Sequence, residues 1–314
     1  MLYFILRRIL QLIPVVIGVT LILFLLFYII PEDPARLILQ KGASPEALEN
    51  LRTKLGIDKP LYIQYWRYVK NLFSGDLGTS YRYQRSVNSI LAEHYPYSIK
   101  LALAAIIIEI IMGIFTGIIS AVKKYSFWDM LATLSTTILV CVPVYWLGMI
   151  MQVIFGLKLG LLPMSGYGDG SIRYYILPAL ALASVSTAYV ARMMRSTMLE
   201  ALSNDYIVTA YAKGLSQFKV IGKHALKNAL IPVVTLIGLD LGSIMGGAIL
   251  TETVFNWPGV GRTVYLAILQ RDAPVVIGGT IVLVMIFVIM NLLVDVLYAW
   301  LDPRIRFERK EINV

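Results

Sequence analysis

The chain has 314 residues, of which 58% are hydrophobic and 15% charged, and its mean hydropathy is +0.73. A soluble domain carries about 25% charged residues to solvate its surface, so this composition excludes a soluble enzyme and indicates a membrane protein. In a membrane protein the net charge of +9 indicates basic cytoplasmic loops, and we expect no nucleic-acid partner.

We expect six helices that span the lipid bilayer. A helix needs about 20 apolar residues to cross roughly 30 Å of hydrocarbon, and long apolar runs without alternation are typical of helices rather than barrel strands. The predicted spans are residues 9–30, 101–122, 131–157, 174–191, 228–251 and 273–294. The predicted fold class is therefore all-α, a polytopic membrane protein with a single domain over residues 1–314.

The first run follows Arg7 and Arg8 and could be mistaken for a signal peptide. Its 22 uncharged residues exceed the roughly 7 to 15 of a cleaved core, and it lacks a cleavage site with small residues. Pro31 and Pro34 are expected to end the helix. We interpret the run as a retained anchor.

The loop of residues 32–98 is predicted to contain two short helices. Ser44 and Pro45 are typical of a helix start, and Gly56 is expected to end that helix. Aromatic residues around Tyr65 and Trp66 predict a second helix at the membrane surface, and residues 75–78 a turn. This region is either an interfacial cap with aromatic anchors or a docking surface for a partner.

Basic residues predict the orientation. With the N-terminus inside, 14 of the 28 basic residues fall on each side, but ten of the outer ones belong to residues 32–100. Loops longer than about 60 residues largely escape the positive-inside rule. The short loops then carry 14 basic residues inside and four outside, so we expect both termini in the cytoplasm.

Two acidic residues lie near the middle of predicted spans, Glu109 and Asp240. An acidic side chain there costs roughly 2.5 to 3.5 kcal/mol, so both should face protein or water. They are candidate pathway residues toward an ammonium group or a metal ion, and the alternative is internal pairing or a neutral buried acid. Pro143 and Pro178 are expected to kink their helices.

The cytoplasmic loop of residues 192–230 is predicted to form two short helices joined at Gly214, which can adopt the left-handed cap. Asn204 and Asp205 are typical N-caps, and Ser216 can begin the second helix. Between them, an apolar stripe runs through Tyr206, Ile207, Ala210 and Tyr211. Such a stripe must be buried either by the rest of this chain or by a partner, and the pattern leaves both open.

Segments within this loop, residues 205–207, 209–210, 212–215 and 224–232, resemble the cytoplasmic loop of binding-protein-dependent ABC importer permeases. The resemblance is closest to the dipeptide, oligopeptide and nickel branch. It extends over nearly the whole chain, through residues 7–8, 31–34, 55–61, 64–65, 75–78, 80, 177–179, 251–255, 257–261, 271–272 and 302–304. The Glu-Ala-Ala opening of the wider family aligns with residues 208–210, where only Ala210 matches, and its proline appears later, at Pro232.

The resemblance implies one permease half of an importer in a bacterial or archaeal cytoplasmic membrane. Its partners would be a second permease, two cytoplasmic ATPase subunits and an extracytoplasmic substrate-binding protein. Peptides are the leading substrate, and nickel or a metal chelate is the alternative. The coupling helix that docks on the ATPase would comprise Asp205, Tyr206, Ile207, Ala210, Lys213, Gly214 and Leu215.

The sequence predicts no chemistry in this chain itself. It contains no GxxxxGK[ST] loop to hold nucleotide phosphates, so ATP would be hydrolysed on other subunits. A lone cysteine, Cys141, and two distant histidines, His94 and His224, predict no catalytic residue, no metal site and no cofactor. The alternative of another class is an ion-coupled secondary transporter that uses Glu109 and Asp240, but the inverted repeats it predicts are not visible.

Overall fold

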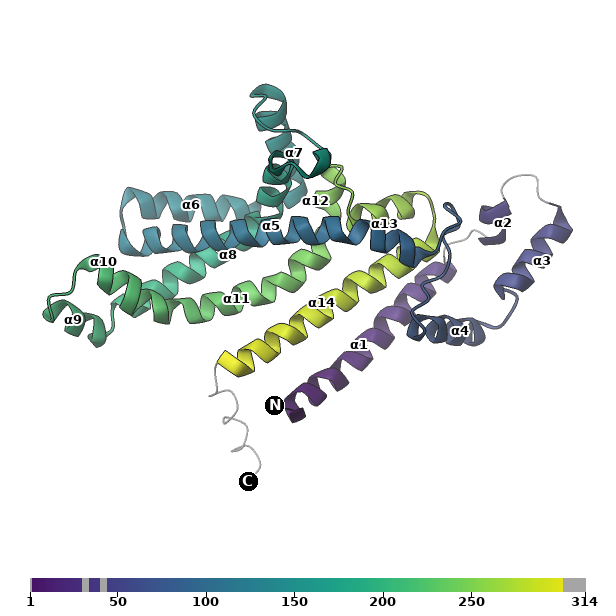
Figure 1. Ribbon diagram of the computed structural model, residues 1–314, viewed down its shortest axis with the longest axis horizontal. Helices are drawn as coiled ribbons and strands as arrows, with labels where there is room; N and C mark the ends of the chain where they lie inside the picture. Colours follow the sequence, from purple (N-terminus) through teal and green to yellow (C-terminus); the bar gives the residue numbers. More distant parts are fainter. Residues whose placement is uncertain (1, 30–33, 40–43, 302–314) are drawn as a thin grey trace. The chain divides into compact units, whose positions relative to one another are not determined.

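The computed structural model describes residues 2–29, 34–39 and 44–301, and these are almost entirely helical (Figure 1). The predicted all-α class is confirmed, since the described residues contain no strand beyond an isolated bridge between Thr79 and Ser86. Two parts of the sequence prediction lie outside the described residues: the helix stop at residues 31–33 and the basic C-terminal segment at residues 302–314.

The longer helices are α1 (Leu2–Ile29), α5 (Val87–Val122), α6 (Phe127–Cys141), α8 (Ile172–Leu202), α11 (Leu226–Gly247) and α14 (Ala273–Leu301). The shorter ones are α2 (Pro34–Leu39), α3 (Pro45–Leu55), α4 (Leu61–Phe73), α7 (Val144–Met151), α9 (Asp205–Ala212), α10 (Gln217–Lys219), α12 (Ile249–Val254) and α13 (Val260–Leu269). Two π-helices, η1 (Gln152–Lys158) and η3 (Val220–Ala225), and one 3₁₀-helix, η2 (Gly168–Gly170), complete the described helices.

Among the described residues, four helical segments are long and apolar enough to cross a membrane: Val87–Val122, Ile172–Leu202, Gln217–Ile244 and Ala273–Val294. The pair formed by α6 and α7 with η1 would make a fifth. The predicted first span falls in α1, a helix of 28 residues that contains an apolar stretch at Ile13–Leu26. The count of six spans remains a prediction.

The third predicted span, residues 131–157, is wrong as a continuous helix. α6 ends at Cys141, α7 begins at Val144, and the two segments are bent by 109°. Pro143 explains the break, because proline has no backbone N–H and forces the residue before it out of the helical region. Accordingly, Val142 is extended, with φ −94° and ψ 126°. Pro143 was expected to kink one helix, and it separates two.

The chain divides into two compact units, Met1–Pro96 with Gly259–Ile286, and Tyr97–Pro258 with Phe287–Val314. In the first unit the predicted caps of α3 are confirmed. The Ser44 side chain accepts a hydrogen bond from the Ala47 N–H, and Gly56 ends the helix with φ +71°.

The second helix predicted in this loop is α4, and it packs on α1 through aromatic residues. The Tyr65 ring lies edge-on to Phe24 with centroids 5.3 Å apart, and the hydroxyls of Tyr65 and Thr20 are 3.1 Å apart. On the outer face of α4, Tyr62 and Trp66 are more than two-thirds exposed. Because tyrosine and tryptophan favour the boundary between lipid and water, this face suits the predicted interfacial position.

In the second unit α8 is the central helix, in contact with α6, α7 and α11. α5 also approaches α8 closely at two glycines, Gly113 and Gly117. A Cβ atom added to Gly117 would lie 2.6 Å from the carbonyl oxygen of Ala191, so only glycine fits there. This packing holds the loop of residues 192–230, because α9 and α10 follow directly from α8 and lead through η3 into α11 (Figure 1).

Candidate functional site

The loop of residues 192–230 contains the two predicted short helices. Asn204 has the extended backbone of an N-cap and α9 follows it, although the Asn204 side chain makes no capping bond and instead donates to the Glu200 carbonyl. Gly214 ends the turn with φ +77°, as predicted. After it, Ser216 is the N-cap residue of α10, which continues into η3 and α11. The predicted positions of both caps are confirmed.

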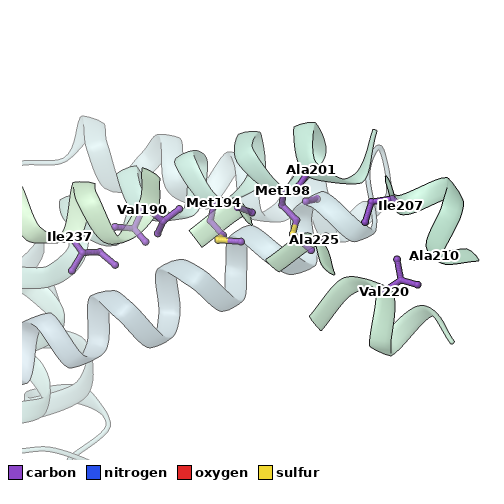
Figure 2. Close-up of a cluster of buried hydrophobic side chains, with 12 residues drawn as sticks. Val190, Met194, Met198, Ala201, Ile207, Ala210, Val220, Ala225 and Ile237 are labelled. Atoms are coloured by element: carbon purple, nitrogen blue, oxygen red, sulfur yellow. The ribbon is translucent and has the colours of Figure 1, made fainter. Parts of the chain in front are cut away.

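One face of α9 is buried by this chain itself. Ile207 is 3% exposed and Ala210 is 5% exposed, and both belong to a hydrophobic cluster with Met198 of α8 and Val220 of η3. Figure 2 shows this cluster following the facing sides of α8 and α11 into the loop. A hydrogen bond of 3.1 Å from the Asn228 side chain to the Tyr206 hydroxyl adds a second link between α9 and α11. α9 is therefore fixed to the ends of two long helices.

Other apolar side chains of α9 and α10 remain accessible. Val208 is 65% exposed, Tyr211 is 46% exposed and Tyr206 is 38% exposed, while Phe218 on α10 is 88% exposed. Apolar side chains grouped on a loop in this way mark an interaction surface. The sequence left open whether this chain or a partner buries the apolar stripe. This chain buries Ile207 and Ala210 and leaves Tyr206 and Tyr211 accessible.

The predicted coupling residues separate into two groups accordingly. Asp205, Tyr206, Lys213 and Gly214 are exposed, and Leu215 is half-buried. Ile207 and Ala210 face the core and cannot touch a partner without unpacking it. Val208 and Phe218 contribute the most exposed apolar side chains of this loop but were not among the predicted coupling residues. Helical spacing alone could have placed Val208 opposite Ile207 and Ala210.

The two acids predicted near mid-membrane interact with each other. Glu109 of α5 is completely buried, and its carboxyl group faces that of Asp240 on α11. Within the described part of the chain, neither Glu109 oxygen forms a hydrogen bond of good geometry, and Asp240 Oδ2 has none either. Two ionised carboxylates facing one another away from water would repel strongly, so this arrangement requires a proton or another cation between them.

Amide substitution tests what the acid pair does. We expect Glu109→Gln to keep the transport rate and specificity, because the amide fills the same space and can donate to Asp240. Glu109→Ala should lower the free energy of unfolding by about 2 kcal/mol or more, since it leaves a cavity in place of a completely buried side chain. Uptake and thermal unfolding of both variants distinguish the roles. Altered substrate specificity of Glu109→Gln at unchanged thermal stability would instead assign the pair to the transport pathway.

Another charged group, Asp129 at the start of α6, was missed by the sequence analysis. Its carboxylate receives two hydrogen bonds from Arg195 of α8, at 2.7 and 2.8 Å, one from the Ser120 hydroxyl, and one of 2.9 Å from the Tyr125 backbone. The Asp129 side chain is only 6% exposed. Arg195, a basic residue in the predicted loop of residues 192–230, therefore joins α6 to α8.

Comparison with known families gives matches over most of the chain. Residues 113–307 match the family described as "Binding-protein-dependent transport system inner membrane component". Residues 1–102 match the corresponding N-terminal family, "Binding-prot-dependent transport system membrane comp, N-term". The first match contains both the loop of residues 192–230 and Asp240, and Glu109 lies between the two matched regions.

Similar curated proteins match at nearly full length. The dipeptide transport system permease protein DppB of Alkalihalophilus pseudofirmus is 44% identical, over 98% of this chain and all of that protein. The probable D,D-dipeptide transport system permease protein DdpB of Escherichia coli K12 is 42% identical, over 93% of this chain and 94% of that protein. The glutathione transport system permease protein GsiC of Salmonella paratyphi A is 39% identical, over 98% of this chain and all of that protein.

Among solved structures, a chain from a crystal structure of an amino acid ABC transporter with histidines has a similar fold. The TM-score is 0.51 at 15% sequence identity, and the match covers 69% of this chain and 94% of that chain. At this level of identity the similarity concerns the fold alone.

Proposed function

Because this chain belongs to the family of inner membrane components of binding-protein-dependent transport systems, we propose that it is one permease half of an ABC importer for peptides. It is a multi-pass protein of the inner membrane. The proposal of a peptide substrate rests on the near full-length similarity to permeases named for dipeptide transport. The remaining partners follow from the same proposal: a second permease, two ATPase subunits and an extracytoplasmic substrate-binding protein.

In this proposal the chain crosses the membrane six times. The spans are α1, α5, the broken pair α6 and α7, α8, α11 and α14. Both termini, and the loop that contains α9, would then lie on the cytoplasmic side, which the distribution of basic residues in short loops supports.

The ATPase would dock on the exposed apolar side chains of α9 and α10. Those of Tyr206, Val208, Tyr211 and Phe218 would enter a hydrophobic groove, while the exposed Lys213 would select an acidic neighbour. No phosphate-binding loop occurs in the sequence, which supports ATP hydrolysis on the docked subunits. Energy then enters this chain only through contact.

The buried face of α9 explains how that contact could move the membrane helices. Ile207 and Ala210 pack in the same cluster as residues of α8 and α11, and packed cores move as rigid pieces rather than deforming continuously. A displacement of α9 by the closing ATPase dimer would therefore be passed to both long helices. Their movement would convert an inward-open pathway into an outward-open one.

A transport assay tests the proposal. The chain is tagged, recovered in mild detergent with the subunits that co-purify, and reconstituted with the recovered binding protein and ATP. We expect ATP-dependent uptake of labelled dipeptides that stops when the phosphate-binding lysine of the ATPase is replaced. Uptake of nickel without peptide uptake, or peptide uptake by this chain alone under an ion gradient, would contradict the proposal.

A further inference from the structure

A short loop in the first unit, residues 79–86, is held in one conformation by its own backbone. Thr79 and Ser86 form an antiparallel bridge, and the Ser80 N–H donates to the Arg85 carbonyl at 2.9 Å. The Gln84 N–H donates back to the Ser80 carbonyl at 3.1 Å. At the base of the loop, the Val87 N–H donates to the Gly78 carbonyl at 2.9 Å. The loop is thus a closed, hydrogen-bonded hairpin.

A buried carboxylate anchors this hairpin from a distant part of the sequence. Asp272, which immediately precedes α14, is completely buried. It accepts hydrogen bonds from the Ser80 hydroxyl at 2.5 Å, from the Tyr81 N–H at 3.0 Å and from the Arg82 N–H at 3.3 Å. Bonds from several donors to one charged acceptor are stronger than neutral ones, so the hairpin is fixed to the start of α14.

The tip of the hairpin has a strained backbone. Gln84 has φ +51°, a left-handed conformation that is unfavourable for a residue with a side chain. Such a conformation persists only where its surroundings determine it, most often at functional sites. Here the Asp272 anchor and a bond from the Gln84 side chain to the Tyr81 carbonyl hold the strained form.

The anchored hairpin presents basic and aromatic side chains outward. Arg82 is exposed, Tyr83 is 51% exposed, and the exposed Arg85 guanidinium pairs with Glu93 at 3.0 Å. Burial, with the nearby Asp272 charge, raises the pKa of Tyr81 to about 12, so Tyr81 is uncharged at neutral pH and the exposed Arg82 supplies positive charge beside the Arg85–Glu93 pair. Residues 58–93 contain five basic and three acidic residues, so the surrounding chain carries a small positive net charge.

From these features we infer that the hairpin of residues 79–86 is a docking element for an acidic patch on the extracytoplasmic substrate-binding protein. The inference rests on the proposed function and its orientation, which place residues 32–98 outside. Tyrosine and arginine are the residues that most often dominate protein interfaces, and a rigid loop loses little entropy when it binds. A lipid surface fits less well, because residues 79–86 contain no aliphatic side chain to insert.

The test measures binding of the recovered substrate-binding protein to the whole importer in nanodiscs, with and without peptide. Arg82→Glu and Tyr83→Ala should each raise the half-saturating concentration by about tenfold or more, as expected for residues that dominate an interface. Lys70→Ala, which removes an exposed basic residue elsewhere in the same loop, is the matched control and should leave it unchanged. The basal ATPase rate should not differ among the three variants.

Asp272→Asn tests the anchor as a positioning residue. Like Arg82→Glu, it should raise the half-saturating concentration of the binding protein, although the buried Asp272 cannot contact that protein itself. Added salt should then have less effect on the remaining affinity. If Asp272→Asn does not fold, Arg82→Glu and Tyr83→Ala still test whether the hairpin binds the substrate-binding protein. Equal affinities of Arg82→Glu, Tyr83→Ala and Lys70→Ala would overturn the inference, as would an Arg82 effect that appears only with anionic lipid.

Binding and transport are measured separately, so the two proposals can fail independently. If docking depends on Arg82 but no peptide is taken up, the proposed peptide substrate is contradicted and the inferred docking element is supported. If Arg82→Glu and Tyr83→Ala take up peptide normally with an unchanged half-saturating concentration, the proposed peptide substrate is supported and the inferred docking element is rejected.

Discussion

A negative charge at Val208 is expected to abolish coupled peptide import without unfolding the chain. The Val208 side chain is 65% exposed on the outer face of α9, so Val208→Asp leaves the hydrophobic cluster beneath it intact. In the proposed assembly the new carboxylate would lie in an apolar contact with the ATPase. Loss of about 2 kcal/mol or more at such a contact would reduce ATP-driven uptake by at least about thirtyfold.

The measurement compares uptake, ATPase recovery on the tagged chain, and membrane insertion of Val208→Asp with those of Val208→Ala. The alanine variant keeps α9 and loses only part of the contact, so it should retain most activity. Normal ATP-driven uptake by a correctly inserted Val208→Asp chain would contradict the proposed docking surface.

Two neighbouring positions would make less decisive tests. A charge at Ala210 would enter the hydrophobic cluster and destabilise the fold, so loss of transport there would not report on the ATPase contact. Gly214→Asp introduces strain as well as charge, because Gly214 has φ +77°. Gly214→Ala carries the same strain without the charge and serves as its control, since no atom lies within 4 Å of a Cβ added there.

The elements that could be predicted from the sequence are those determined by neighbouring residues. Ser44 with Gly56, and Ser216 after Gly214, mark helix ends through local backbone chemistry, and the structure has them where they were expected. The long apolar helices follow equally from the local absence of charge. The acid pair could be predicted only in part. The cost of burying a charge predicted that Glu109 and Asp240 would face protein or water, but not that they would face each other.

What could not be predicted depends on contacts between distant segments. The pattern of α9 shows an apolar stripe, but only the packing against Met198 and Val220 divides it into a buried and an exposed half. The break at Pro143 illustrates the same limit, because a proline can either kink or end a helix, and tertiary packing decides. The partner of Arg195 lies 66 residues earlier, and no spacing rule connects the two.

Removing that partner is expected to have the largest effect on stability. In Asp129→Ala the Arg195 guanidinium loses both of its hydrogen bonds to the carboxylate, and Ser120 and the Tyr125 N–H lose an acceptor. Breaking a buried ion pair costs about 3–5 kcal/mol, and the lower end applies here because the Arg195 side chain is 30% exposed. The free energy of unfolding, measured by SDS titration of the purified chain in mixed micelles, should fall accordingly.

A double substitution separates the cost of an unpaired charge from the value of the pair. Asp129→Leu with Arg195→Met removes both charges, and apolar replacements of buried pairs are often neutral or stabilising. We therefore expect the double variant to be more stable than either single variant, with a coupling energy of about 1–3 kcal/mol. Strictly additive losses would mean that α6 and α8 are held together by packing alone. Uptake by a stable double variant would then show whether the ion pair also contributes to movement of α8 during transport, because a purely structural pair can be replaced without loss of rate.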